Sequence, residues 1–299
     1  MIMYHSPNLN NLPPSGGVRQ HITHLLPALE RQGVQFTDWL PEADVVHVQT
    51  AYRVPFFRKP DVWTCHGGFV PPIPEVADNL RETKTIIAVA RWVVDQYFPD
   101  RDAVYVIPNG VDVSEFENLP PSGLEPGYIL WSKAFLRPDW DMFYRLAEAN
   151  PGLRFVSTLF DPCRPTLPVG LGGVPELPNL QVIGIQIYEV MKSVMNDCSV
   201  YVSTGSEVCP IQVLEAWACR KPVLAWDGDG NAELLRYQGF VVGGELYTEF
   251  DEMHAGLQTL LANPAYQGNA GRWSVECDFD WDEIARRTVE VYHRSCAVL

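Results

Sequence analysis

The sequence has no long apolar run, no excess of basic residues and no closely spaced cysteine pair. No segment of the 299-residue chain approaches the roughly 18 uninterrupted apolar residues of a membrane-spanning helix. The start, MIMYHSPNLNN, lacks the basic residues and apolar core of a secretory leader, so we predict a first strand there. Seven cysteines without CxxC spacing favour reduced thiols and a cytoplasmic protein.

Basic side chains are scarce: 22 Lys and Arg stand against 37 Asp and Glu, for a net charge of −15. Most of the acidity follows residue 113, because the first 113 residues hold 9 basic and 12 acidic side chains and the rest hold 13 and 25. An acidic surface disfavours non-specific binding to a polyanion, which depends on phosphate neutralisation. It still allows a local basic cleft.

The first half of the chain alternates short apolar strands with helical segments, which predicts a parallel sheet covered by helices on both faces. The expected strands are Ile2–Tyr4, Val34–Thr37, Val45–Val48, Val62–Cys65, Ile86–Val89 and Val104–Ile107, and the expected helices are His21–Arg31 and Trp92–Phe98. A Pro- and Gly-rich segment over residues 120–127 then suits an interdomain linker. We therefore predict an N-terminal Rossmann-like domain over residues 1–119.

A second alternating set predicts a further Rossmann-like domain over residues 128–278. Its expected strands are Tyr128–Trp131, Leu153–Val156, Val182–Ile183, Val200–Ser203, Val223–Trp226 and Phe240–Val242. Its expected helices are Met142–Glu148, Ile187–Asn196, Ile211–Ala218, Ala232–Tyr237 and Phe250–Leu261. The tail, residues 279–299, contains an amphipathic helix over Trp281–His293. In two such domains the strand C-termini are expected on either side of one ligand cleft.

The most informative stretch is Val200–Glu233, where an apolar strand leads through small residues and Pro210 into an apolar-periodic run. Proline is favoured at the first position of a helix, and the free N–H groups of that turn attract an anion such as a diphosphate. Glu207 and Glu215 bracket this turn at about 10 Å, from ~1.5 Å of rise per helical residue. Two carboxylates so placed suit the sugar and the ribose of a sugar nucleotide, because each accepts two hydrogen bonds from a diol.

This stretch resembles the signature of retaining glycosyltransferases of family 4, which have the GT-B fold, and the resemblance extends over nearly the whole chain. It implies that Glu207 contacts the donor sugar, that Glu215 contacts the ribose, and that the backbone between them holds the diphosphate. The family usually has a Gly-Phe-Gly-like segment there, whereas this chain has Cys209-Pro210-Ile211. In the family the N-terminal domain selects the acceptor, the C-terminal domain binds the donor, and the Trp-bearing tail helix crosses back onto the N-terminal domain. The resemblance therefore implies an acceptor domain over residues 1–119 and a nucleotide-sugar donor domain over residues 128–278.

Three further segments fit the resemblance in the first half. Ser15-Gly16-Gly17-Val18 lies between a strand and a helix, where the family's loop touches the donor phosphate, and Arg19 adds charge beside it. Thr64-Cys65-His66-Gly67-Gly68 is similar to a motif whose histidine lies near the reacting sugar. His47, on an expected strand, competes for that role, although an isolated strand histidine is more often a hydrogen-bonded core residue. Residues 107–112, IPNGVD, form a positioning turn.

Two cations and one acidic triplet are candidates for contact with the donor phosphates, the cations directly and the triplet through a metal ion. Lys133 and Arg137 stand where the family has an arginine followed by a lysine, so they are expected to neutralise the diphosphate. Asp227-Gly228-Asp229 could be taken for a metal clamp, but it follows a strand where the family has a Gly-rich loop. Because two cations already serve the phosphates, we predict no metal and no cofactor.

The predicted site is assembled from these segments, with Gln186 and Tyr188 expected in the loop that selects the base. The expected donor-binding residues are Gly16, Gly17, Lys133, Arg137, Gln186, Tyr188, Glu207, Val208, Cys209, Pro210, Ile211 and Glu215. The expected catalytic residues are His66, Glu207, Lys133 and Arg137. The expected acceptor-binding residues are Arg19, Arg53 and His47.

The activity expected from the resemblance is metal-independent, retaining transfer of a sugar from a UDP- or GDP-linked donor to a hydroxyl of a small molecule, glycan or lipid. The segment 52–59, YRVPFFRK, suits either an anionic lipid surface or nucleic acid. A viral-type enzyme acting on 5-hydroxymethyl pyrimidines in DNA is therefore an alternative acceptor class. A non-catalytic sugar-nucleotide binder and a sugar-nucleotide epimerase are alternatives of other classes, because fold alone does not decide function.

Overall fold

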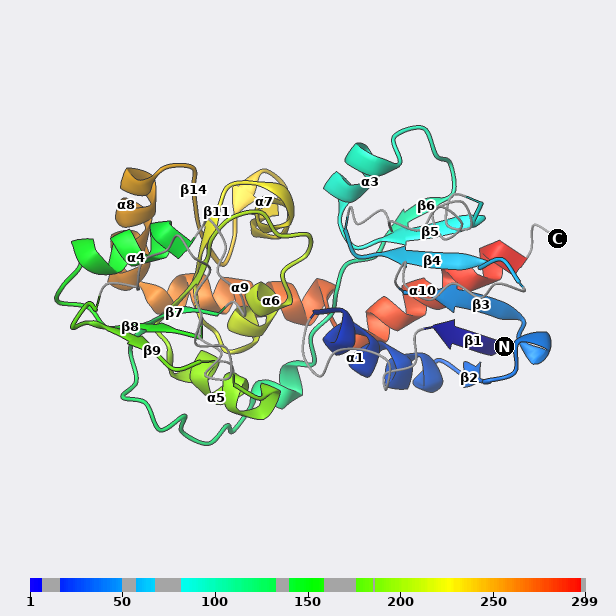
Figure 1. Ribbon diagram of the computed structural model, residues 1–299, viewed down its shortest axis with the longest axis horizontal. Helices are drawn as coiled ribbons and strands as arrows, with labels where there is room; N and C mark the ends of the chain where they lie inside the picture. The colour runs from blue at the N-terminus through cyan, green and yellow to red at the C-terminus, as the bar shows by residue number, and fades with distance from the viewer. Residues whose placement is uncertain are drawn as a thin grey trace. The chain divides into compact units, whose positions relative to one another are not determined.

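The computed structural model describes residues 1–6, 17–49, 58–67, 82–132, 140–158, 176–184 and 186–296. The chain divides into two compact units. Unit 1 comprises Met1–Asp112, Val208–Ile211 and Asp278–Leu299, and unit 2 comprises Val113–Glu207 and Gln212–Cys277. Each unit contains a six-stranded parallel sheet with helices packed on it (Figure 1), which confirms the predicted α/β class.

The sheet of unit 1 has the strand order β2-β1-β3-β4-β5-β6. The strands are β1 (Ile2–Ser6), β2 (Gln35–Phe36), β3 (Val45–Val48), β4 (Val62–Cys65), β5 (Thr85–Ala88) and β6 (Val104–Val106). The helices are α1 (Gly17–Arg31), α3 (Arg91–Tyr97) and α10 (Trp281–Cys296), with a 3₁₀ turn, η2, at Leu40–Glu42. The strand order reverses between β1 and β3, and ligands bind parallel sheets of this kind at the carboxyl ends beside such a reversal.

Alternation along the strands gives the two faces of this sheet different partners. One face packs against α1 and α10 in a single apolar cluster that includes Met3, Leu25, Val45, Val62, Ile87, Trp281, Ile284 and Val291. The opposite face packs against α3 through Cys65, Ile86, Ala88 and Val93. Because side chains two apart share a face of a strand, His47 and Thr64 lie on the same face as α10.

The sheet of unit 2 has the order β14-β11-β10-β7-β8-β9, again with all pairs parallel. The strands are β7 (Ile129–Trp131), β8 (Phe155–Ser157), β9 (Leu180–Val182), β10 (Val200–Ser203), β11 (Val223–Trp226) and β14 (Gly244–Tyr247). The helices are α4 (Trp140–Ala149), α5 (Tyr188–Asp197), α6 (Ile211–Ala218), α7 (Asp229–Leu235), α8 (Phe250–Ala262) and α9 (Pro264–Asp278), with a 3₁₀ turn, η3, at Val113–Phe116. Here the order reverses between β7 and β10.

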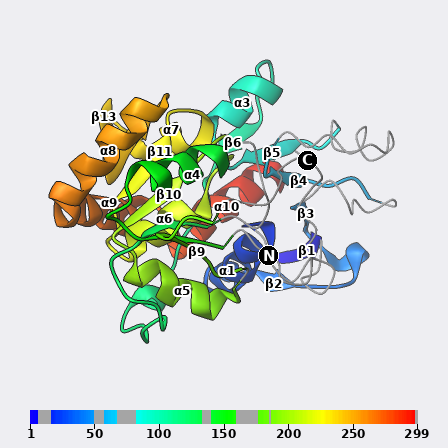
Figure 2. The ribbon, with the colours of Figure 1, turned by 60° about the vertical axis from the view of Figure 1, so that its left-hand side comes forward.

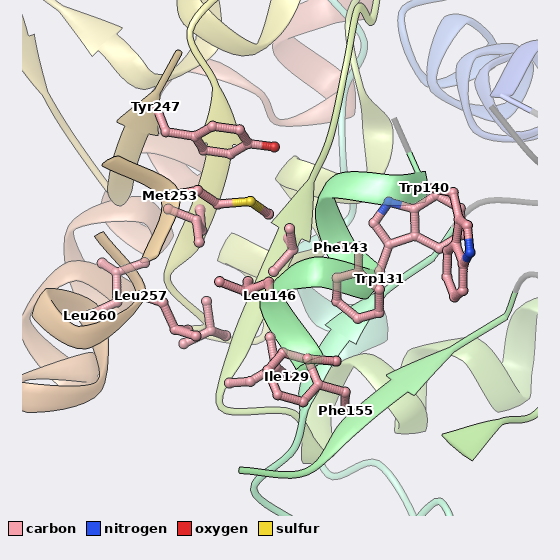
Figure 3. Packing of buried hydrophobic residues seen from close by; sticks show 14 residues of the cluster. Ile129, Trp131, Trp140, Phe143, Leu146, Phe155, Tyr247, Met253, Leu257 and Leu260 are labelled. Carbon is pink, nitrogen blue, oxygen red and sulfur yellow. The ribbon is translucent and has the colours of Figure 1, made fainter. Parts of the chain in front are cut away.

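The core of unit 2 on one face of the sheet joins the strands to α4 and α8, which contact one another (Figure 2). Figure 3 shows the aromatic rings of Trp131, Trp140, Phe143 and Phe155 beside Leu146, with Met253, Leu257 and Leu260 supplied by α8. All eight of these side chains are at most 6% exposed. This continuous apolar layer includes residues of β7 and β10 and holds both strands against α4 and α8.

Two elements of unit 2 differ from the sequence expectation. The segment expected as a sheet strand near Phe240 forms a small antiparallel hairpin, β12 (Arg236–Tyr237) with β13 (Phe240–Val241), and the sixth sheet strand is β14. Helix α9 was not predicted at all. Strand β14 and helix α9 both contain glycines that look like breakers but permit close packing: a Cβ on Gly244 would lie 2.0 Å from the carbonyl oxygen of Val223, and one on Gly271 would lie 2.2 Å from the indole of Trp217.

No helix in the described part of the chain is both long enough and apolar enough to cross a membrane.

Candidate functional site

The loop after β10 lies at the point where the sheet of unit 2 reverses its strand order. Trp131, the last residue of β7, donates from Nε1 to the hydroxyl of Thr204, just past β10, at 2.6 Å. This bond ties the ends of the two strands together, and both side chains are fully buried. Helix α6 begins directly after Pro210, as the sequence predicts. The loop over residues 204–210 therefore starts at the edge where parallel sheets bind ligands.

Helix α7 holds this loop in shape. Ser203 shares a hydrogen bond of 2.8 Å with Asn231 Oδ1, and Asn231 Nδ2 donates to the carbonyl of Gly205 at 2.9 Å. The amide of Gly230 donates to the carbonyl of Glu207 at 2.8 Å. Asn231 is fully buried, so its amide spans the loop from the inside. Sequence reasoning missed Asn231, although its place two residues after the DGD triplet was a usable signal.

Glu215, on α6, lies in a cluster of titratable side chains. The hydroxyl of Tyr188, the first residue of α5, is hydrogen-bonded to its carboxyl group. Lys192 stands nearby with 7% of its surface exposed, 2.9 Å from Glu189 and 3.6 Å from Glu115, and its Nζ lies 5.1 Å from the centroid of the Tyr188 ring. Two of the residues expected to bind the donor, Tyr188 and Glu215, are thus in direct contact.

Burial raises the pKa of Glu215 to about 7, and the neighbouring Glu115 adds to the increase, while the Tyr188 hydroxyl and Lys192 oppose it. The pKa of Tyr188 is raised well above its ordinary value, chiefly by burial and then by the charge of Glu215. A carboxylate that ionises near neutral pH gains stability from any partner that donates hydrogen bonds to its charged form. Hydroxyl donors on a ligand are such partners.

Four of the seven residues between the glutamates, Val208–Ile211, belong to unit 1. Trp92 Nε1 donates to the carbonyl of Val208 at 2.9 Å, and Asn109 Nδ2 donates to that of Cys209 at 2.7 Å. Gly67 lies against the same segment, since a Cβ there would come within 2.9 Å of the Val208 side chain. Both carbonyls are thereby fixed in direction. The IPNGVD turn has the positioning role that its sequence suggested, through Asn109.

His66, a half-buried residue, lies immediately after β4 and close to His21 and His5. Its Nε2 is 2.9 Å from Oε1 of Gln49, a fully buried residue at the end of β3. Burial, followed by the proximity of His21 and His5, lowers the pKa of His66 well below its ordinary value. The imidazole is therefore neutral near pH 7. It can donate or accept a hydrogen bond but does not contribute a positive charge.

His47 is a core residue in this structure. It has no exposed surface, its Nδ1 is 2.6 Å from the hydroxyl of Tyr292, and its Nε2 is 2.7 Å from the hydroxyl of Thr64. Burial and the nearby His5 lower the pKa of its imidazole well below the ordinary value. This environment agrees with the hydrogen-bonded core histidine that the sequence allowed, and it disfavours contact of His47 with an acceptor.

The remaining predicted residues are only partly accounted for. Lys133, Arg137, Gly16 and Arg53 lie outside the described residues. Gly17 begins α1, and Arg19 is a half-buried residue of the same helix. Gln186 donates its side-chain amide to the carbonyl of Ile183 at 2.7 Å, so it closes its own loop.

The DGD triplet engages its carboxylates with protein partners. Asp227 is paired with Arg236 at 2.5 Å, and Asp229 accepts a hydrogen bond from Ser206. In the described part of the chain, no group of three or more His, Cys, Asp or Glu side chains is arranged to hold a metal ion. Metal independence remains a prediction.

Comparisons with known proteins agree with this fold. Residues 170–263 match the family model of group 1 glycosyl transferases. The comparison with curated proteins found no match. Sucrose-phosphate synthase from Thermosynechococcus elongatus is 14% identical over 100% of this chain and 99% of that chain, with a TM-score of 0.74.

Two further solved structures are similar over almost their whole length. HepE from Anabaena, in complex with UDP and glucose, is 14% identical over 97% of this chain and 98% of that chain, with a TM-score of 0.70. A glycosyltransferase from Rickettsia africae is 14% identical over 98% of both chains, with a TM-score of 0.68. At this level of identity the likeness establishes the fold, which is that of GT-B glycosyltransferases with their two Rossmann-like domains.

Proposed function

We propose that the protein is a cytoplasmic, retaining glycosyltransferase of family 4 that uses a nucleotide-diphosphate sugar and needs no metal ion. The observation that carries the proposal is Glu215, a carboxylate on α6, the helix that follows β10; it is hydrogen-bonded to Tyr188, and burial raises its pKa to about 7. The match of residues 170–263 to group 1 glycosyl transferases supports the same activity. The GT-B neighbour HepE has been solved with UDP-glucose, which favours a UDP-linked donor over a GDP-linked one.

In unit 2 the donor nucleotide would lie against the loop after β10. Glu215 accepts hydrogen bonds from the ribose hydroxyls, and Tyr188 keeps its carboxylate oriented. Glu207, whose carbonyl is held by Gly230, accepts hydrogen bonds from the sugar. Lys133 and Arg137 are assigned to the diphosphate, where they stabilise the charge that grows on the leaving group.

The reaction breaks the bond between the anomeric carbon and the phosphate oxygen and forms a bond from the same face to the acceptor oxygen. The proton of the acceptor hydroxyl passes to the leaving phosphate. His66, neutral near pH 7, serves as a hydrogen-bonding residue for a substrate hydroxyl. The acceptor is assigned to a hydroxyl-bearing small molecule, glycan or lipid, for which unit 1 supplies the binding surface.

A thermal-shift screen with UDP-, GDP-, ADP- and TDP-sugars tests the donor assignment, because a ligand that binds only the native state raises its stability. Slow release of the nucleotide diphosphate without acceptor separates an enzyme from a pure binder, which releases none. Glu207→Ala and Lys133→Ala should each abolish release and transfer, whereas Glu148→Ala, on the exposed face of α4, should change neither. Normal transfer by the Glu207→Ala enzyme would refute the donor site.

A further inference from the structure

The orientation of Asn109 determines where the proton of a neighbouring histidine resides. Asn109 Nδ2 lies 2.7 Å from the carbonyl oxygen of Cys209, and a carbonyl can only accept. The other side of the amide, Oδ1, therefore points to His21, whose Nδ1 is 2.8 Å away. Because Oδ1 accepts, His21 must carry its hydrogen on Nδ1. All of these groups are buried.

The second ring nitrogen of His21 is then an acceptor that lacks a donor. Nε2 is buried, and the part of the chain that the structure describes offers it no hydrogen-bond partner. His21 is only 3% exposed, and burial lowers its pKa to about 4, with a smaller contribution from His24 in the same direction and an opposing one from Asn109. Leaving a buried acceptor without a donor costs about 1–3 kcal/mol. Native proteins rarely keep such an atom without a reason.

The position of His21 indicates what the reason is. Its ring centroid lies 4.7 Å from that of His66, edge to face, and 5.3 Å from that of Trp281. These rings stand at the carboxyl end of the unit 1 sheet, since His66 follows β4 and Asn109 follows β6. This edge is where a parallel sheet binds ligands. A neutral nitrogen lone pair repels phosphate and carboxylate oxygens, and burial disfavours an ammonium group.

We propose that His21 Nε2 accepts a hydrogen bond from a hydroxyl of an uncharged, polyhydroxylated substrate group beside His66, and that Asn109 is the positioning residue that fixes the required tautomer. The inference rests on the proposed function, which supplies two sources of such a hydroxyl: the sugar of the donor and the acceptor. It makes His21 a substrate-binding residue and narrows the substrate group to a neutral one.

Nitrogen-15 NMR of the protein labelled at histidine tests the inference directly, with the His21 signals assigned by their loss in His21→Phe. In the free protein we expect Nδ1 to be protonated and Nε2 to be bare between pH 6 and pH 8. UDP-glucose or methyl glucoside should shift the Nε2 signal, and UDP should not.

A shift with UDP-glucose alone identifies the donor sugar as the source, and a shift with methyl glucoside alone identifies the acceptor. Protonated Nε2, or a Nε2 signal that neither ligand moves although UDP-glucose raises the melting temperature, overturns the inference. No thermal response to any sugar nucleotide would instead refute the proposed function.

Variants of His21 and Asn109 separate a chemical role from a structural one. His21→Phe keeps a planar ring but removes the acceptor, so kcat/KM should fall about tenfold or more, the equivalent of one hydrogen bond. His24→Gln, three residues along α1, is the control and should retain the wild-type rate. Asn109→Asp keeps an acceptor for Nδ1 but removes the donor to the Cys209 carbonyl, so part of the activity should be lost at every pH. Its carboxylate also favours the imidazolium, which raises the pKa of His21 and turns Nε2 into a donor. Transfer by this variant should therefore fall further below the raised pKa than above it. A loss of equal size at every pH would show that Asn109 acts only on stability, and would contradict the proposal.

Discussion

Replacing Glu215 by glutamine should stabilise the protein at alkaline pH while it impairs donor binding. The ionised carboxylate is poorly solvated in the folded protein, because burial raises its pKa from 4.5 to about 7. Glutamine has nearly the same shape, and its carbonyl oxygen can still accept from the hydroxyl of Tyr188. The substitution therefore removes the cost of burying a charge and retains the hydrogen bond.

The magnitude follows from the difference in proton binding between the folded and unfolded states. Because the folded protein holds the Glu215 proton more tightly, its free energy of unfolding falls as the pH rises from about 4.5 to about 7 and is constant above that range. One pKa unit corresponds to about 1.4 kcal/mol, so the full shift represents about 3 kcal/mol. Partial exposure of the side chain reduces this, and we expect a gain of about 1–3 kcal/mol for Glu215→Gln at pH 8.

Urea unfolding at pH 5 and pH 8 measures the effect. Wild type and Glu215→Gln should differ little at pH 5, and the variant should be more stable at pH 8. Glu148→Gln removes an exposed carboxylate on α4 and should change the free energy of unfolding by less than about 0.5 kcal/mol at either pH. Equal stability of wild type and Glu215→Gln at pH 8 would refute the argument that this carboxylate is strained by burial. Weaker binding of UDP-glucose by the more stable variant would show that the buried charge of Glu215 contributes to ligand binding.

Four other substitutions test packing in unit 2. Gly243→Ala and Gly239→Ala both place a side chain at a positive φ, 72° and 87°, but only the first also strikes Trp217, 2.5 Å from the new Cβ. We expect Gly239→Ala to cost about 1 kcal/mol in urea unfolding and Gly243→Ala about 1–3 kcal/mol more. Phe143→Ala leaves a cavity among the rings of Figure 3 and should lower the free energy of unfolding by about 3–5 kcal/mol. Arg272→Met removes the donor that lies 2.6 Å from the last carbonyl of α6 and should cost about 2 kcal/mol, with the exposed glutamate partners left solvated.

Elements whose burial follows a simple pattern could be predicted from the sequence. Val45–Val48, Val62–Cys65, Val200–Ser203 and Val223–Trp226 are strands at the expected bounds, because short β-branched and aromatic runs buried on both faces are typical of parallel sheets. The helix Ile211–Ala218 also begins and ends as expected, since proline marks its start and its apolar side chains recur at helical spacing.

The elements that were missed depend on contacts between distant residues. In β14 and α9, Gly244, Gly268 and Gly271 lower local propensity, so the sequence looks like loop. The structure shows why glycine is needed there: a Cβ on Gly268 would lie 2.0 Å from the carbonyl of Arg220, and the other two glycines are equally crowded. Helix and strand propensity counts only the local cost of glycine. The close packing of α9 against α6, which offsets that cost, involves residues about 50 positions away in the sequence.

In the candidate site, too, local patterns could be predicted from the sequence and contacts between distant residues could not. The spacing of Glu207 and Glu215 could be recognised because both belong to one short motif. The sequence does not reveal that Glu215 contacts Tyr188 and lies near Lys192 and Glu115, since these residues come from α5 and η3. Their effect is on the pKa, a property that residue spacing alone does not encode.

The histidines mark the limit of the sequence argument most clearly. A motif drew attention to His66, and a strand position drew attention to His47, while His21 had no acidic or nucleophilic neighbour to suggest chemistry. What distinguishes His21 is a bond to Asn109, 88 residues away, and a second bond that fixes which end of that amide faces it. A chain of two hydrogen bonds thus determines which ring nitrogen is bare. The chemical character of this histidine is therefore a property of the fold rather than of its local sequence, and only the folded arrangement could assign it.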